Sequence, residues 1–355
     1  MTNKRGLFGM SERTFKKNEI TEGVIWKQLL IFFFPIMLGT LVQQFYTTVD
    51  TIIVGRFVGK AALASVGGPA AVIANIVITF FNGLANGAAV IIAQYYGSRD
   101  EKRLHVGLHT AYAFSIVTSI AVTVIGMIGT SYFLKWMNTP EDMMADSTIY
   151  LRVYFFGIIF TLVYNMGAAI MRAAGDSRRP LLYLIVCSVM NIILDIVMVV
   201  FLHMGIAGAA LATVISQCVS AVLVTYSLMH AYDVMKLKLR ELRMNMSVLA
   251  KELKIGIPGA LQACAYGVTN VIIQAVVNGF GTDTAAGWAA YGKLDMIFWT
   301  VNSALGVAVT TFVGQNYGAG KMDRVYKSIR VNLGISYLFN GVVLIVLYVF
   351  CEPLY

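Results

Sequence analysis

Three acidic residues and one basic residue lie inside long apolar stretches of this 355-residue sequence: Asp50, Asp195, Asp295 and Lys293. An ionisable group at the centre of a membrane-spanning helix costs about 2.5–3.5 kcal/mol, so each is a functional candidate. A buried carboxylate can bind a proton or a hard cation such as Na⁺. The chemistry that these residues suggest is therefore ion binding within a membrane.

Two of the acids are expected at similar depth with two neutral oxygen-bearing residues. At about 1.5 Å per helical residue, Asp50 lies ~9 Å, Asp195 ~12 Å and Thr213 ~10 Å from the outer ends of their stretches. Asn191 precedes Asp195 by four residues and shares its helix face. If these helices pack together, two carboxylates in one pocket cannot both ionise cheaply, so a proton binds near neutral pH and Na⁺ can use the same oxygens. A structural hydrogen-bond cluster between helices is the alternative.

The remaining intramembrane acid points to substrate contact. Lys293 and Asp295 are two residues apart and do not face each other on a helix, so Asp295 meets either substrate or a separate basic partner. Aromatic and methionine side chains in a cavity can bind flat or cationic molecules. The candidates for lining a substrate cavity are Gln44, Tyr46, Asn165 and Asp295.

His105 and His109 have the i, i+4 spacing of metal ligands. They begin an apolar stretch beside a basic loop, and no further Cys or acidic ligand stands out nearby. We therefore interpret them as interfacial histidines and predict no metal site apart from Na⁺ at the acidic pocket.

Nine apolar stretches are long enough to supply the helices, since about 20 residues cross a ~30 Å hydrocarbon core. The spacing of Gly83 with Gly87, and of Gly314 with Gly318, favours close helix packing. The stretches cover residues 28–54, 62–94, 105–133, 150–172, 181–203, 206–231, 254–280, 285–316 and 331–350.

Composition and charge agree with a membrane protein. The chain is 58% hydrophobic and 13% charged, whereas soluble domains carry about 25% charged residues. A water-soluble enzyme and a disordered chain are thereby excluded. Of the 27 Lys and Arg residues, 22 lie in the amino-terminal segment or in loops after even-numbered stretches, which places the N-terminus in the cytoplasm. The net charge of +9 thus reflects orientation and not nucleic-acid binding.

The sequence also contains an internal repeat. Pro35 matches Pro258 at an offset of 223 residues, residues 94–97 (QYYG) match 315–318 (QNYG), and Arg103 matches Arg324 at 221. The offset spans six stretches, so both copies enter the membrane in the same sense and are related by a pseudo-two-fold axis along its normal. A second copy of six would require about three helices beyond the nine. A naturally nine-helical protein with an accidental repeat is the alternative.

With these motifs in view, the chain resembles the multidrug and toxic compound extrusion (MATE) family. The motifs that carry the resemblance are residues 44–50 (QFYTTVD), 54–56 (VGR), 94–97 (QYYG), 171–180 (MRAAGDSRRP), 191–195 (NIILD) and 208–213 (GAALAT). The resemblance implies twelve helices in two six-helix lobes, arranged as a V around a central cavity. It also implies a coupling-cation site at positions that match Asp50, Asn191, Asp195 and Thr213. No acid lies between Glu252 and Asp283, where some members carry a cation-site glutamate, so coupling is assigned to the first lobe.

The expected fold is an all-α polytopic membrane protein with a complete six-helix N-terminal lobe and a partial C-terminal lobe of about three helices. We assign residues 1–25 to a cytoplasmic tail, 26–235 to the N-terminal lobe, 236–253 to a cytoplasmic linker and 254–355 to the partial C-terminal lobe. The chain is expected to be monomeric, with membrane lipids and small organic cations as partners.

The predicted function is cation-coupled export of drugs or organic cations across the cytoplasmic membrane, by antiport with H⁺ or Na⁺ and without a cofactor. We do not expect an enzyme. Two alternatives remain: a flippase for lipid-linked saccharides from the same superfamily, and a membrane-embedded enzyme that uses Asp50 and Asp195 as an acid–base pair.

Overall fold

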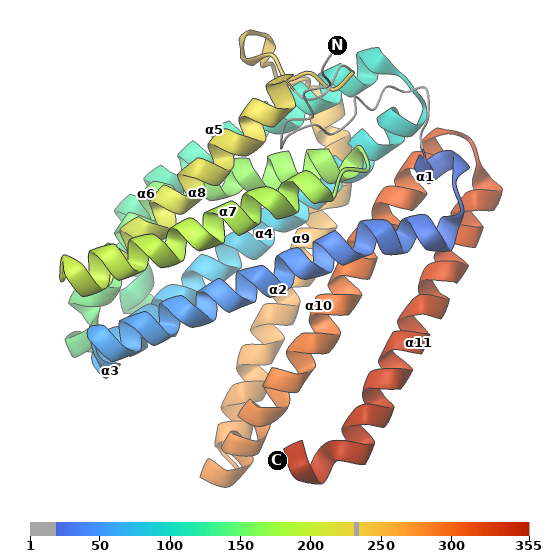
Figure 1. Cartoon of the computed structure of the whole chain (residues 1–355). Coiled ribbons are helices and arrows are strands. Elements are labelled where there is room, and N and C mark those ends of the chain that lie inside the picture. Colours follow the sequence, from blue (N-terminus) through green and yellow to red (C-terminus); the bar gives the residue numbers. More distant parts are fainter. Residues whose placement is uncertain (1–18, 231–233, 355) are drawn as a thin grey trace, which may run out of the picture.

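The computed structural model describes residues 19–230 and 234–354, and within these residues every regular element is a helix (Figure 1). Nine of the helical spans are long and apolar enough to cross a membrane, as predicted. The long helices are α2 (Ile25–Phe57), α4 (Ala71–Gly97), α5 (Glu101–Trp136), α6 (Glu141–Ala173), α7 (Arg178–Asp195), α8 (Gly205–His230), α9 (Met246–Asn278), α10 (Thr282–Gly318) and α11 (Met322–Leu354).

Helices α5 and α9 begin before their apolar stretches, and a side-chain cap marks the start of each. The Asp100 side chain accepts a hydrogen bond from the Arg103 backbone N–H at 3.0 Å and so starts α5. Asn245 likewise accepts from the Ser247 and Val248 backbone N–H groups, at 3.1 and 3.2 Å. Helix α9 therefore begins at Met246, and the last eight residues of the range 236–253, which the sequence assigned to the linker, are helical.

Two of the spanning segments are not uniform α-helices. The second consists of α3 (Lys60–Ser65), a π-helical turn at Val66–Ala70 and α4, and Gly68 within that turn has a non-helical ψ of −126°. Pro69 follows and has no backbone N–H to donate. The fifth segment continues from α7 into a second π-helical turn at Ile196–Phe201. Hydrophobic periodicity reveals neither break.

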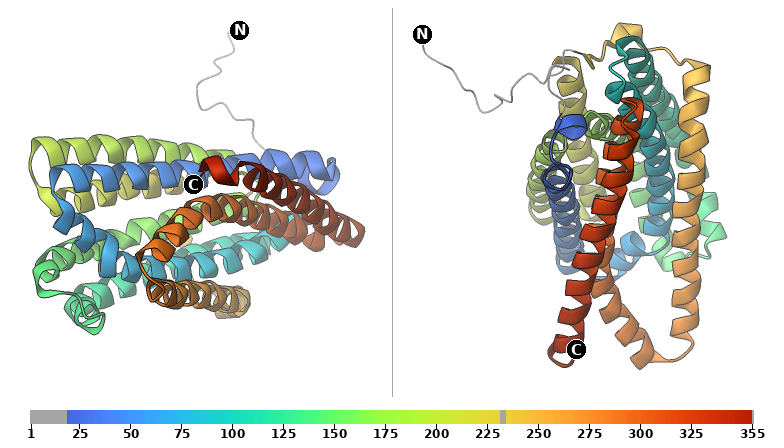
Figure 2. Two further views of the ribbon diagram at one scale, coloured as in Figure 1. Left: turned by 90° about the horizontal axis from the view of Figure 1, so that it is seen from below. Right: turned by 90° about the vertical axis from the view of Figure 1, so that its right-hand side faces the viewer.

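The helices form two groups, α2 with α4–α8, and α9–α11. They converge where the short helix α1 (Glu19–Glu22), the α4–α5 connection and the α10–α11 connection meet, which we call the α1 end, and diverge toward the opposite end (Figure 1; Figure 2). A buried core joins α4, α5, α6 and α8, with side chains such as Ile92, Leu108, Tyr112 and Ile170.

The helix pairs α4–α9, α4–α10 and α2–α10 form the main seams between the groups. In the α4–α9 seam, small residues bring the backbones into contact: a Cβ at Gly83 would lie 2.6 Å from the Ala260 nitrogen, and one at Gly87 would lie 2.5 Å from Gly256 Cα. The close packing predicted from the glycine spacing is thus present. The α2–α10 seam is built from larger apolar side chains, including Leu29, Phe33, Ala304, Ala308 and Phe312.

Helix α1 contacts both groups at the converging end. Arg324 of α11 donates to the backbone oxygens of Ile20 at 3.0 Å and Gly23 at 2.7 Å. From the other group, Arg99 forms an ion pair with Glu22 at 3.3 Å. The Arg324 hydrogen bonds fasten α1 to α11, and the Arg99–Glu22 ion pair fastens it to the α4–α5 connection.

Candidate functional site

Three helices position the side chains of the predicted cation site. Helix α2 carries Asp50 in its last third, α7 carries Asn191 and Asp195, and α8 carries Thr213. Helix α7 packs against both α2 and α8. Asp195 is the last α-helical residue before the π-helical turn at Ile196–Phe201, and such turns occur frequently at functional sites.

The structure brings the two acids together. The side chains of Asp50 and Asp195 lie close enough to interact directly. Asp195 is fully buried at 0% exposure and Asn191 is 1% exposed. Asn191 Nδ2 donates to Thr213 Oγ1 at 3.4 Å, and Thr213 Oγ1 donates to the Ala209 carbonyl at 3.1 Å. Asn191 precedes Asp195 by one turn of α7, so the two pairs are neighbours, and we call these four residues the polar group.

The polar group is rich in acceptors and poor in donors. Within the described residues, no donor reaches Asp195 Oδ1 or Oδ2, Asp50 Oδ1, or Asn191 Oδ1. Buried polar atoms normally have a hydrogen-bond partner, so four oxygens without one need an explanation. The two carboxyl groups can bond to each other only when one of them carries a proton. A shared proton, or a cation bound among these oxygens, suits the arrangement chemically.

Tyrosines surround the acids, and one of them was not predicted. Tyr150 of α6 lies within electrostatic range of Asp50, Asp195 and Tyr46, and its ring stacks near that of Tyr154 at a centroid separation of 6.3 Å. Sequence analysis missed Tyr150 because it is one of 18 tyrosines in apolar surroundings and has no distinguishing neighbour.

The substrate-cavity candidates are spread over three helices. Tyr46 adjoins the acids on α2, whereas Gln44 is exposed on the same helix and Asn165 is half-buried on α6. Asp295 lies on α10, in the other helix group, where it accepts a hydrogen bond from Tyr291 Oη at 3.4 Å. The side chain of its sequence neighbour Lys293 lies outside the described residues. Substrate contact by these residues stays a prediction.

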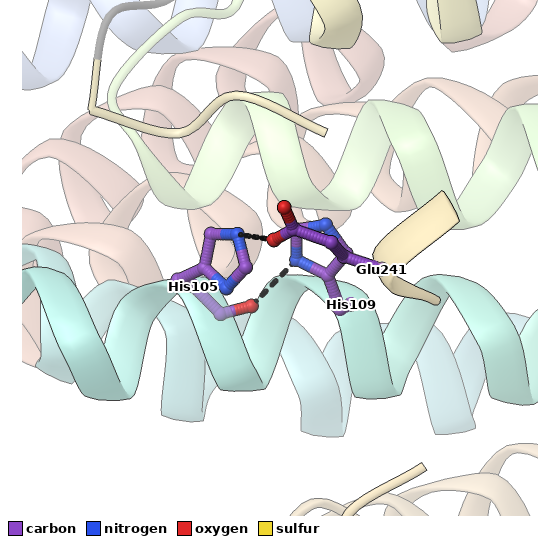
Figure 3. A group of neighbouring side chains, drawn as sticks. All are labelled: His105, His109 and Glu241. Carbon is purple, nitrogen blue, oxygen red and sulfur yellow. Dashed lines mark hydrogen bonds and ion pairs between the residues drawn. The ribbon is translucent and has the colours of Figure 1, made fainter. Parts of the chain in front are cut away.

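The two interfacial histidines do have a nearby acid, contrary to the sequence analysis (Figure 3). Glu241, from the connection between α8 and α9, places Oε2 at 3.1 Å from His105 Nε2, and one ligand atom from each of the three residues lies within 4.8 Å of the others. The sequence did not suggest this contact because it joins residues that are far apart in the chain.

The histidine cluster is nevertheless arranged as a structural tie. His109 Nδ1 lies 2.8 Å from the His105 carbonyl, and Nε2 accepts from the Lys238 backbone N–H at 3.1 Å, so both ring nitrogens are engaged. A hydrogen bond from the Lys238 ammonium, together with the nearby histidines, holds the pKa of Glu241 below its usual range. The cluster fastens the connection between the helix groups to α5.

Comparison with known proteins identifies the family. The MatE family model matches residues 35–197 and 258–355. Two Bacillus subtilis proteins are similar over most of the chain: "Probable multidrug resistance protein YoeA" is 31% identical over 93% of this chain and 73% of its own length, and "Probable multidrug resistance protein YpnP" is 34% identical over 87% and 69%.

Solved structures share the fold. An outward-facing multidrug resistance MATE family transporter matches with a TM-score of 0.88 and 23% identity, over 97% of this chain and 76% of that one. A MOP superfamily transporter from Pyrococcus furiosus matches with a TM-score of 0.87 and 23% identity, over the same shares of the two chains. The chain therefore belongs to the MATE family, and it is a multi-pass membrane transporter and not an enzyme.

Proposed function

We propose that the protein is a multidrug efflux transporter that exchanges H⁺ or Na⁺ for organic cations by alternating access. The observation that carries the proposal is the contact between Asp50 and the fully buried Asp195, in a group with four acceptor oxygens that no donor from residues 19–230 or 234–354 satisfies. The names of the two Bacillus relatives support drugs as the substrate class. The site that we assign to the coupling ion consists of Asp50, Asn191, Asp195 and Thr213.

The proposed exchange depends on the charge of the two acids. When the end opposite α1 is open, a proton or Na⁺ enters the acidic group and neutralises it. Helix α2 then repacks near Pro35, and the affinity for a cationic substrate falls because the attracting charge has gone. The substrate leaves outward, and the coupling ion continues inward when the α1 end opens.

The membrane potential sets the scale of transport. One elementary charge crossing 100 mV supplies about 2.3 kcal/mol. Since about 1.4 kcal/mol corresponds to a tenfold ratio, one charge supports a substrate gradient of roughly 50-fold before any pH difference contributes. For this direction of transport, the α1 end faces the cytoplasm. The protein acts as a monomer in the plasma membrane, surrounded by lipids.

The experiment compares Asp50→Asn and Asp195→Asn with the matched control Asp142→Asn, in which the acid is exposed at the start of α6. Each full chain is reconstituted in liposomes, and uptake of a fluorescent organic cation is measured against separate H⁺ and Na⁺ gradients. We expect both site variants to lose at least tenfold in ion-driven transport while retaining the melting temperature of the wild type, and Asp142→Asn to transport normally. Undiminished ion-driven transport in both site variants would refute the proposed coupling site.

A further inference from the structure

A second buried acid lies outside the site already described. Glu252 of α9 is 2% exposed, and neither Oε1 nor Oε2 has a hydrogen-bond partner among the described residues. Its own backbone oxygen lies 2.6 Å from the position that a Cβ at Gly87 of α4 would occupy. Glu252 follows the start of α9 by six residues, or about 9 Å along the helix axis. The residue therefore belongs to the α4–α9 seam, near the α1 end.

No charged side chain of the described residues neutralises this acid. From α4, the titratable group near Glu252 is Tyr95, and Tyr95 in turn interacts with Asp100 and with Arg103 of α5. Among the described residues, no side chain of α4, α5 or α10 donates a hydrogen bond to the Glu252 carboxyl or forms an ion pair with it. An ionised carboxylate without a counter-charge is strongly disfavoured in a buried position, whereas the uncharged acid is tolerated far better.

The internal repeat shows that packing does not require an acid here. At the offset of 223, Glu252 corresponds to Leu29, which is fully buried in the α2–α10 seam. The equivalent position in the α2–α10 seam is thus filled by an apolar side chain of similar size. The α4–α9 seam departs from the repeat by holding a group that can gain and lose a proton.

We propose that Glu252 is a proton-binding site whose protonation accompanies closure of the α4–α9 seam. When the seam is closed, the carboxyl carries a proton; when the seam opens, water at the α1 end hydrates the carboxylate, and the proton is released to that water. Reclosing requires a proton from the same side. The role of this step in transport rests on the proposed alternating access, but the titration of the seam does not.

The test follows the separation of α4 and α9 by electron spin resonance in liposomes, from mildly acidic to mildly alkaline pH. Spin labels are attached at Ser98 and Met246, both exposed at the α1 end, after the four native cysteines have been replaced. All samples carry Asp50→Asn and Asp195→Asn, so that the acids of the proposed coupling site cannot contribute. Glu252→Gln retains the shape of the side chain, and Glu252→Leu introduces the residue type found at the equivalent position 29 of the α2–α10 seam. Glu101→Gln is the control, because Glu101 is an exposed acid at the same end of the protein.

With Glu252 present, we expect the ratio of closed to open seam to fall by up to tenfold per pH unit as the pH rises, the limit for one proton. Glu252→Gln and Glu252→Leu should remove this dependence, and Glu101→Gln should retain it. The infrared C=O band of a protonated carboxyl should disappear in both Glu252 variants. The inference fails if Glu252→Gln keeps the pH dependence or if no such band is lost. Normal ion-driven transport by Asp50→Asn and Asp195→Asn would instead reject the proposed function and leave this result unaffected.

Discussion

The backbone of Gly97 in α4 packs directly against the backbone of Gln315 in α10, and Gly318 of α10 makes the same contact with Gln94 of α4. Both pairs are related by the repeat offset of 221 residues. Reciprocal contacts of this kind arise where two equivalent surfaces meet across a two-fold axis. The repeat inferred from sequence is therefore expressed as a symmetric contact at the α1 end.

Replacing either glycine by alanine should weaken this contact. A Cβ at residue 97 or 318 would overlap backbone atoms, which cannot move aside as a flexible side chain can. We expect Gly97→Ala and Gly318→Ala each to lower stability by about 1–3 kcal/mol, measured as a lower melting temperature in detergent. Gly306→Ala on α10 is the control, because no described residue has an atom within 4 Å of the Cβ that it would add. The higher helix propensity of alanine should raise the stability of this variant by up to about 1 kcal/mol. Equal melting temperatures for all three variants would contradict this account of the contact.

The two repeat-related arginines should differ in importance. Arg324 donates to the backbone oxygens of Ile20 and Gly23, and also to Asn316 Oδ1 at 3.1 Å. Arg103 instead forms an ion pair at 3.3 Å with Asp100, the residue that caps its own helix. Hydrogen bonds to charged groups are worth about 1.5–3 kcal/mol each, and exposed ion pairs about 0–1 kcal/mol.

Arg324→Ala should therefore increase amide hydrogen exchange in residues 19–24 by tenfold or more, while Arg103→Ala leaves it within about threefold of the wild type. Comparable exchange in the two variants would show that α1 is held by other contacts.

Asn191→Leu should distinguish between the two coupling ions. The substitution removes Asn191 Oδ1, one of the four acceptor oxygens for which the described part of the chain supplies no donor, but leaves both carboxyl groups in place. Loss of one oxygen ligand should raise the half-saturating Na⁺ concentration by about tenfold, equivalent to 1.4 kcal/mol. A proton needs only the two acids, so the half-saturating H⁺ concentration should change by less than about threefold. Transport rates measured against each ion separately provide both values, and an unchanged Na⁺ dependence would exclude Asn191 as a Na⁺ ligand.

The tie between α5 and the α8–α9 connection should weaken in acid. Folding lowers the pKa of Glu241. The carboxylate therefore contributes fully to stability above its unfolded pKa of about 4.3, and this contribution disappears as the pH falls through the lower pKa of the folded state. After correction for intrinsic rates, hydrogen exchange in residues 234–245 should therefore rise a few-fold between about pH 5 and pH values below about 4, the range in which Glu241 gains its proton. Glu241→Gln should give the higher exchange at every pH. A pH-independent exchange in the wild type would show that the ion pairs of Glu241 do not hold the connection.

The sequence contains what is needed to predict the spans and the contact of the acids, but not every partner. Hydrophobicity along the chain locates the nine helices, and counting residues from the ends of the stretches places Asp50 and Asp195 at one depth. The contact between Glu241 and His105 joins segments 136 positions apart and depends on the path of an irregular connection. The burial of Glu252 depends on which face of α9 packs against α4. Gly83 and Gly87 allow that close packing, but the sequence does not show which face of α9 they meet.

The π-helical turn after Asp195 affects how this protein is compared with its relatives. Such a turn accommodates one residue more than the α-turn that it replaces. A homologue with an unbroken α-helix in this region needs a one-residue gap in the alignment between Asp195 and Phe201. Without that gap, roles transferred from column to column beyond Asp195 would be displaced by one position, and side chains that occupy the same place in space would be compared with the wrong neighbours.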